Sequence, residues 1–148
     1  MTFIPPENTA TRPITVLGAG TLGRRIALML ATRGTEVRLY ARSAATRDAG
    51  VAFAREQMPA VLAKLPGSKA GTIVGVGDMV AALKDAWIIV ESVPEDLELK
   101  KDIFKQVDAL SEPDAILASN SSSYASSAFA ESVKDPTRLL NTHFLMPP

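Results

Sequence analysis

Residues 14–34 read ITVLGAGTLGRRIALMLATRG, and this stretch sets the architecture of the rest of the chain. It opens with a short apolar run rich in β-branched residues, which is typical of a strand. The run stops at Gly18-Ala19-Gly20. After Gly23, apolar residues recur at helical spacing: Ile26, Ala27, Leu30 and Ala31. A strand, a glycine turn and a helix in this order predict one unit of an open α/β sheet.

The three glycines of this stretch follow the pattern G-x-G-x-x-G, and each has a separate physical task. Gly18 permits the tight turn, Gly20 lets the backbone approach a pyrophosphate, and Gly23 lets the helix pack against the strand. A pyrophosphate would accept hydrogen bonds from free N–H groups at the start of the helix. The alternative is an ordinary turn that binds nothing. The sequence predicts a dinucleotide site made by Gly18, Ala19, Gly20, Thr21, Leu22 and Gly23.

The composition excludes several classes of protein. The 148 residues suit one domain with a real core. Sixteen basic and sixteen acidic residues balance, so no excess charge favours nucleic acid or an anionic membrane. Cysteine is absent, which excludes disulfides and thiolate chemistry, and a single histidine cannot form a zinc site unaided. No apolar run approaches the roughly 18 residues that cross a bilayer.

The two ends of the sequence also carry predictions. Residues 1–13 lack an apolar core and read as a flexible leader, so we expect a cytoplasmic protein. The chain stops abruptly at Met146-Pro147-Pro148, shortly after a predicted strand. We therefore expect it to be a fragment of a longer protein.

The rest of the sequence alternates between strand and helix patterns. Helices are expected at residues 44–64, 79–84, 97–110 and 124–133, with Pro59 kinking or splitting the first of them. Further strands are expected at residues 36–40, 71–76, 87–90, 115–118 and 139–144. This alternation predicts a Rossmann-type, doubly wound, mainly parallel sheet with helices on both faces, occupying residues 14–148.

The end of the second predicted strand bears on cofactor choice. In a dinucleotide fold, an acid about 20 residues beyond the first glycine selects the free 2′-hydroxyl of NAD. This chain has Ala41 there, followed by Arg42 and Ser43. A guanidinium, a hydroxyl and a helix start suit a 2′-phosphate, so the sequence predicts NAD(P) binding with NADP favoured. The alternative is that Arg42 is a solvated surface charge.

Four segments, in this order, resemble the nicotinamide-binding domain of L-3-hydroxyacyl-CoA dehydrogenases. They are LGAGTLGRRIA, IIVESVPEDLELKKDIF, ILASNSSS and NTHFLMPP. The resemblance implies oxidation of a secondary alcohol on an acyl-CoA, or the reverse reaction, by an enzyme that is a homodimer at full length. Relatives that act on other hydroxy acids, such as gulonate-type dehydrogenases, share the architecture.

The resemblance also implies roles for single residues. Glu95 and Lys100 correspond to residues near the nicotinamide end of the cofactor, and Asn120 belongs to the same loop as Ser122. Ser122 corresponds to a serine that meets both the substrate hydroxyl and the nicotinamide region. His143 corresponds to the catalytic base, and imidazole titrates near neutral pH, which suits general base catalysis.

The chain departs from this family pattern in three ways. Ala41 stands where the family has an acid, and Met146 stands where it has an asparagine. The family's C-terminal helical domain is absent from this chain, and the glutamate that orients the histidine is expected beyond residue 148. We therefore expect the chain to bind cofactor and to turn over poorly. Two alternatives stay open: a cofactor-binding module without turnover, and a related hydroxy-acid dehydrogenase.

Overall fold

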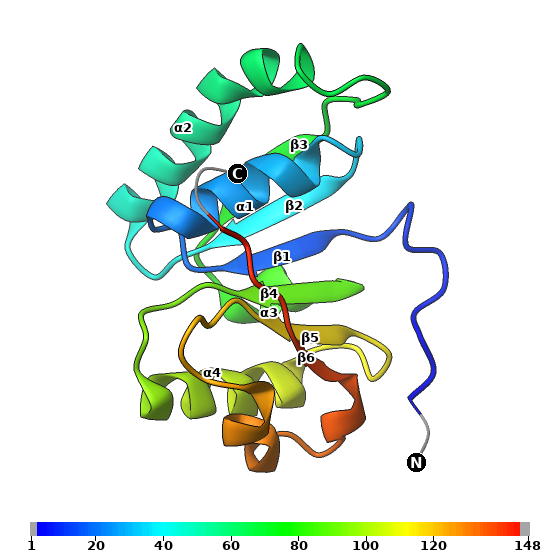
Figure 1. Cartoon of the computed structure of the whole chain (residues 1–148), viewed down its shortest axis with the longest axis vertical. Coiled ribbons are helices and arrows are strands. Elements are labelled where there is room, and N and C mark those ends of the chain that lie inside the picture. Colours follow the sequence, from blue (N-terminus) through cyan, green and yellow to red (C-terminus); the bar gives the residue numbers. More distant parts are fainter. Residues whose placement is uncertain (1–2, 146–148) are drawn as a thin grey trace.

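The computed structural model describes residues 3–145 of the chain, and its centre is a sheet of parallel strands. The strands lie in the order β3-β2-β1-β4-β5-β6, and every neighbouring pair is parallel (Figure 1). The predicted doubly wound sheet is therefore confirmed. The bounds of the strands are β1 Ile14–Leu17, β2 Glu36–Tyr40, β3 Thr72–Val76, β4 Ile88–Glu91, β5 Ile116–Ser119 and β6 Leu139–Asn141.

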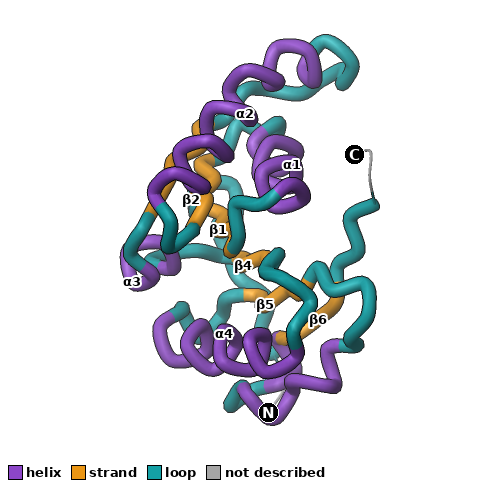
Figure 2. Tube along the Cα trace, turned by 90° about the vertical axis from the view of Figure 1, so that its left-hand side faces the viewer, coloured by secondary structure: helices purple, strands orange, loops and turns teal. Residues whose placement is uncertain are grey.

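Helices cover both faces of this sheet, as Figure 2 shows. The α1 and α2 helices pack together over one face, and α4 packs with the 3₁₀ segment η1 on the other. No helix within residues 3–145 is long and apolar enough to cross a membrane. The bounds are α1 Thr21–Ala31, α2 Ala44–Leu62, α3 Met79–Leu83, α4 Leu97–Leu110, η1 Ser126–Ser132 and η2 Pro136–Arg138.

The hydrophobic core is divided by the sheet into two clusters. Successive strand residues point to opposite faces, so Val16 packs in the cluster under α1 and α2. Leu17 packs in the cluster that contains Phe104 of α4 and Phe129 of η1. All four residues of β1 are buried, as expected for a central parallel strand covered on both faces.

Three predicted elements differ from the structure. The segment predicted as a helix over residues 124–133 forms only the 3₁₀ turns of η1. The helix predicted to reach Lys64 ends at Leu62, and Pro59 does not split it, because α2 is continuous through Pro59 and the Pro59 carbonyl accepts the Ala63 N–H at 3.1 Å. The last strand ends at Asn141 rather than Phe144, because its partner strand β5 ends at the paired residue Ser119.

Contacts with the rest of the fold extend into the predicted leader, before the predicted domain start at Ile14. Arg12 donates to both carboxylate oxygens of Asp114 at 2.6 and 2.9 Å, and the Pro13 carbonyl accepts the Trp87 N–H at 3.1 Å. The end of the predicted leader is therefore tied to the sheet. The other end of the prediction, at Met146 to Pro148, lies outside the described residues, as do residues 1 and 2.

Candidate cofactor and catalytic site

The glycine turn lies where the strand order reverses, between β1 and β4, which is where open α/β sheets bind ligands. Gly18 has a φ of +106°, and a Cβ atom there would clash with the Ser92 carbonyl oxygen. A Cβ atom on Gly23 would lie against the carbonyl oxygen of Gly18. Both glycines are therefore required by the close packing of the turn itself.

Gly20 differs from the other two because its surroundings are open. A Cβ atom on Gly20 would meet nothing within 4 Å, and its backbone is extended, with φ −68° and ψ −171°. No side chain caps α1, and its first turn holds no acid. The N–H groups of Thr21, Leu22 and Gly23 have no partner one turn earlier in the helix. Open space beside free N–H donors at a helix N-terminus fits the pyrophosphate of a dinucleotide.

Two basic side chains lie near the end of β2. Arg42 is the predicted cofactor contact, and Arg47 is not assigned to the cofactor from the sequence. Arg42 is exposed, and the Ser43 hydroxyl caps α2 by accepting the Thr46 N–H at 3.3 Å. Arg47, one turn into α2, donates to the Ala41 carbonyl at 3.2 Å. Its side chain lies against Gly75, where a Cβ atom would come within 2.9 Å of it. This contact joins segments far apart in the sequence, so no local pattern reveals it.

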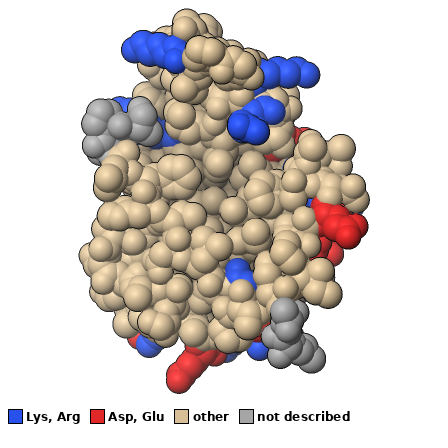
Figure 3. All heavy atoms as spheres, turned by 45° about the vertical axis from the view of Figure 1, so that its right-hand side comes forward, with Lys and Arg blue, Asp and Glu red and all other residues tan. Residues whose placement is uncertain are grey.

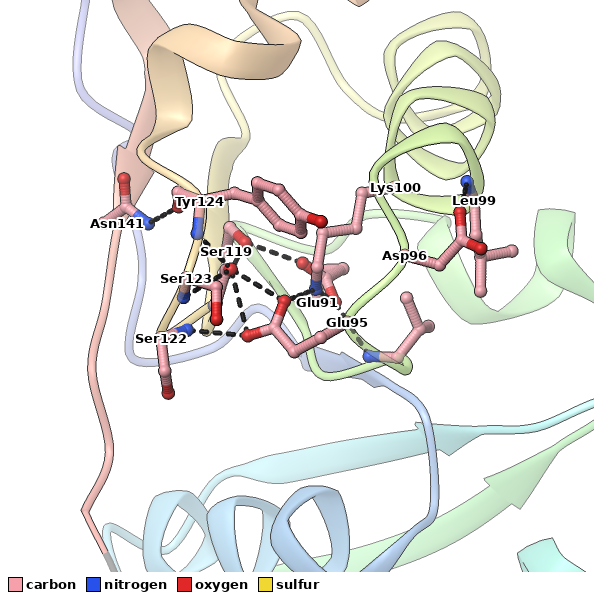
Figure 4. A network of polar contacts seen from close by, with 12 residues as sticks. Glu91, Glu95, Asp96, Leu99, Lys100, Ser119, Ser122, Ser123, Tyr124 and Asn141 are labelled. Carbon is pink, nitrogen blue, oxygen red and sulfur yellow. Dashed lines mark hydrogen bonds and ion pairs between the residues drawn. The ribbon is translucent and has the colours of Figure 1, made fainter.

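A serine-rich loop, residues 119–123, leaves the carboxyl end of β5 and is held from two sides (Figure 4). The Ser122 N–H donates to Glu95 Oε1 at 2.7 Å, and the Ser121 hydroxyl donates to the same carboxylate at 2.8 Å. The Ser121 hydroxyl also accepts the Tyr124 N–H at 2.9 Å. These contacts fix the backbone of Ser122 and leave its own hydroxyl at the surface.

His143, two residues beyond the end of β6, meets that hydroxyl. The distance between Ser122 Oγ and His143 Nε2 is 3.2 Å, and both side chains are exposed. The chain around His143 is fixed by two bonds, from the Thr142 N–H to the Ser119 carbonyl at 2.8 Å and from the Phe144 N–H to Asn120 Oδ1 at 2.8 Å. The amide oxygen of Asn120 therefore supports the histidine segment. Beyond it the chain runs back toward α1, and Phe144 packs against the cluster on that face (Figure 1).

Lys100 lies inside the protein rather than on a solvated helix face. Its side chain is 1% exposed, and its Nζ donates to Glu91 Oε1 at 2.7 Å and lies 3.4 Å from Glu95 Oε2. From the sequence, Glu91 is expected to be only a loop acid, but it is the last residue of β4 and its side chain is fully buried. A signal for the burial of Lys100 was present, since it follows Leu97 by three residues and precedes Phe104 by four, on the apolar face of α4.

Glu95 is the member of this group that reaches the surface, with 40% of its side chain exposed. Partial burial opposes ionisation of its carboxyl. The hydrogen bonds from the Ser122 N–H and the Ser121 hydroxyl, together with the charge of Lys100, outweigh that effect and lower the pKa of Glu95. Glu95 is therefore a carboxylate at neutral pH and acts as a hydrogen-bond acceptor for the loop.

The surface charge is uneven although the whole chain is neutral. Basic side chains gather at the end of the molecule formed by α2 and the loop after it, seen at the top of Figure 3, while the centre of that face carries little charge. Arg33, Lys64 and Lys69 at this end are exposed. Within residues 3–145, no group of three metal-ligating side chains is present.

A comparison with known proteins identifies the family of this chain. Residues 13–148 match the family described as 3-hydroxyacyl-CoA dehydrogenase, NAD binding domain. The chain belongs to this family. The glycine turn, with its open space at Gly20, fits the nicotinamide dinucleotide that the family name implies.

Individual relatives agree with the family assignment. A 3-hydroxybutyryl-CoA dehydrogenase of Clostridioides difficile is 32% identical over 139 residues, covering 90% of this chain and 50% of the relative. The solved structure of FadB2 from M. tuberculosis superposes with a TM-score of 0.81 at 30% identity, covering 93% of this chain and 50% of that one. A diketoreductase structure, described as acting on dicarbonyl compounds, gives a TM-score of 0.80 at 31% identity, covering 98% of this chain and 51% of that one. The chain spans about half the length of these relatives.

Proposed function

We propose that this chain is the cofactor-binding half of an enzyme that transfers a hydride between a nicotinamide cofactor and the C3 position of a 3-hydroxyacyl-CoA. The observation that carries the proposal is the pair of Ser122 Oγ and His143 Nε2, 3.2 Å apart at the carboxyl edge of the sheet. The glycine turn packs against Ser92. This residue directly follows Glu91, the buried partner of Lys100. The acyl-CoA substrate is supported by the family description and by the name of the Clostridioides difficile relative, and the basic end at α2 suits its phosphates.

The roles of the two side chains follow from their chemistry. In the oxidising direction, His143 Nε2 accepts the proton of the C3 hydroxyl while the C3–H bond breaks and the carbonyl forms. The Ser122 hydroxyl, which lies beside Nε2, donates to the substrate oxygen and holds it at the base. Bound nicotinamide supplies the acceptor for the hydride, and the reverse reaction returns both groups to the carbonyl.

The test is reduction of acetoacetyl-CoA, followed by the loss of NADH or NADPH absorbance. Turnover should fall in Ser122→Ala and stay near the unmodified level in Ser123→Ala, because the exposed Ser123 makes no contact with His143 through its side chain. Cofactor binding without turnover by the full-length protein would favour the alternative of a binding module. Equal effects of the two serine substitutions would exclude the role of Ser122.

We infer further that NADP(H) binds more tightly than NAD(H). Ala41 offers no carboxylate to repel a 2′-phosphate, and Arg42 and Arg47 both lie at the end of β2. Ser43 adds a hydroxyl at the first turn of α2. A charge-assisted hydrogen bond contributes about 1.5–3 kcal/mol, or roughly ten- to a hundredfold in affinity. Titration of the chain with both cofactors at one ionic strength tests this, and tighter NAD(H) binding would contradict it.

Homodimerisation of the full-length protein and a cytoplasmic location remain predictions from the resemblance and from the leader sequence. A hydroxy-acid substrate of the gulonate type is the less favoured reading, because the Clostridioides difficile relative is a 3-hydroxybutyryl-CoA dehydrogenase.

A further inference from the structure

The buried carboxylate of Glu91 is the centre of the polar network beneath the serine loop (Figure 4). Glu91 is the last residue of β4, and its side chain accepts three hydrogen bonds. Oε1 accepts from the Val93 N–H at 2.7 Å and from Lys100 Nζ at 2.7 Å, and Oε2 accepts from the Ser119 hydroxyl at 2.6 Å. None of these groups forms a hydrogen bond with the side chains of Ser122 and His143, which meet at the surface.

Two routes of hydrogen bonds and ion pairs lead from this carboxylate to Ser122. The first runs through Ser119, whose hydroxyl oxygen accepts the Ser121 N–H at 3.2 Å. The second runs through Lys100 to Glu95, which accepts the Ser122 N–H at 2.7 Å. Both routes end on the loop that places the Ser122 hydroxyl 3.2 Å from His143.

We infer that Glu91 is a positioning residue, which holds Ser122 against His143 through Ser119 on one side and through Lys100 and Glu95 on the other. The inference rests on the proposed function for its catalytic meaning. Lys100 then serves as the connector between two carboxylates, because its ammonium group is enclosed by Glu91 and Glu95.

The charges make this network sensitive to the loss of one member. Lys100 is 1% exposed and would keep only the longer, 3.4 Å contact to Glu95 if the Glu91 carboxylate were replaced. A buried charge that loses a partner forces its surroundings to rearrange. The rearrangement reaches Ser122, because Glu95 is the acceptor for the Ser122 N–H.

The chain offers a direct reporter, because His143 is its only histidine. The Hε1 resonance of this one imidazole in a proton NMR spectrum therefore reports on the site, and neither cofactor nor turnover is needed. Ser122→Ala, which removes the contact to Nε2, gives the reference displacement of that resonance. Glu91→Gln should displace it by a comparable amount, while the protein keeps a dispersed, folded spectrum.

The matched control is Asp108→Asn. It breaks another buried ion pair, between Asp108 and Arg138, whose side chains are 7% and 4% exposed. It should lower stability and leave the His143 resonance in place. If Glu91→Gln does not fold, Ser119→Ala removes one hydroxyl of the same network and should displace the resonance.

A His143 resonance that superposes on that of the unmodified chain in folded Glu91→Gln overturns the inference. So does an unmoved resonance in Ser119→Ala where that variant takes its place. Because the measurement needs no reaction, failure of the acyl-CoA assay would count against the proposed function and leave this result standing.

Discussion

Two glycines of the same turn, Gly20 and Gly23, should respond to one substitution in opposite ways. Replacement of Gly23 by alanine places a Cβ atom against the carbonyl oxygen of Gly18, which is backbone and cannot rotate away. Replacement of Gly20 by alanine places the same atom in open space, at a φ of −68° that any residue adopts. The pair therefore separates the packing task of the motif from its binding task.

The magnitudes follow from these surroundings. Overpacking against backbone lowers the free energy of unfolding by about 1–3 kcal/mol. The clash at Gly23 should lower that of the Gly23→Ala variant by about 2–3 kcal/mol. For a chain of this size that lowers Tm by about 4–12 °C. In Gly20→Ala the free energy of unfolding should change by less than about 1 kcal/mol. Loss of one charge-assisted N–H contact to a phosphate should weaken cofactor binding in Gly20→Ala by roughly ten- to a hundredfold.

The assay is thermal unfolding of both variants without cofactor, followed by titration of folded protein with NADH and NADPH. Gly20→Ala should melt with the unmodified chain and bind poorly. Unweakened binding of both cofactors by this variant would show that the pyrophosphate does not approach Gly20. A Gly20→Ala protein as unstable as Gly23→Ala would refute the reasoning from open space.

Three further predictions concern the base, the cofactor and acid stability. In an active form of the protein, His143→Gln should lower turnover by about 10²–10⁴-fold and leave cofactor affinity unchanged; near-normal turnover would reject His143 as the base. Ala41→Asp combined with Arg42→Ile should reverse the preference for NADP(H), measured by titration, because it removes an attraction and adds a repulsion; an unchanged ratio of affinities would show that Arg42 faces solvent. The hydrogen bond from Arg12 lowers the pKa of Asp114 below the ordinary 3.8, so its contribution to stability is present above that pH and is lost as the pH falls through the folded value. Melting curves of Asp114→Asn and the unmodified chain should therefore differ at neutral pH and converge in acid, and a gap that persists in acid would contradict this.

Much of the fold could be predicted from the sequence because its signals are local. The apolar runs at β1 and β4 are short and β-branched, and the glycine turn identifies the first strand–helix unit. The errors arose where a neighbour decides the outcome. The last strand ends at Asn141 because β5 has no residue left to pair beyond Ser119, and nothing near Phe144 in the sequence records that limit.

The candidate site was harder to predict because its contacts join distant segments. The resemblance singled out Glu95 and Lys100, but it gave no hint that Lys100 lies beneath the surface, paired with Glu91. Asn120 was grouped with the serine loop, and its contact with the Phe144 N–H spans 24 residues. The support that Arg47 gives to the end of β2 likewise depends on Gly75 of β3 and on Gly77 after it, both of which lie against the Arg47 side chain.

The position of His143 depends on the register of two parallel strands. Ser119 of β5 pairs with Asn141 of β6, so the serine loop and the histidine segment leave the sheet side by side. A shift of one residue would turn alternate side chains to the opposite face and separate Ser122 from His143. Apolar packing holds this register through Leu139, which packs against the cluster that contains Phe104, while Leu140 is exposed. Polar contacts add to it, from the Thr142 N–H to the Ser119 carbonyl and through the network of Glu91. Substitutions in that network should therefore disturb the site while both apolar clusters of the core stay intact.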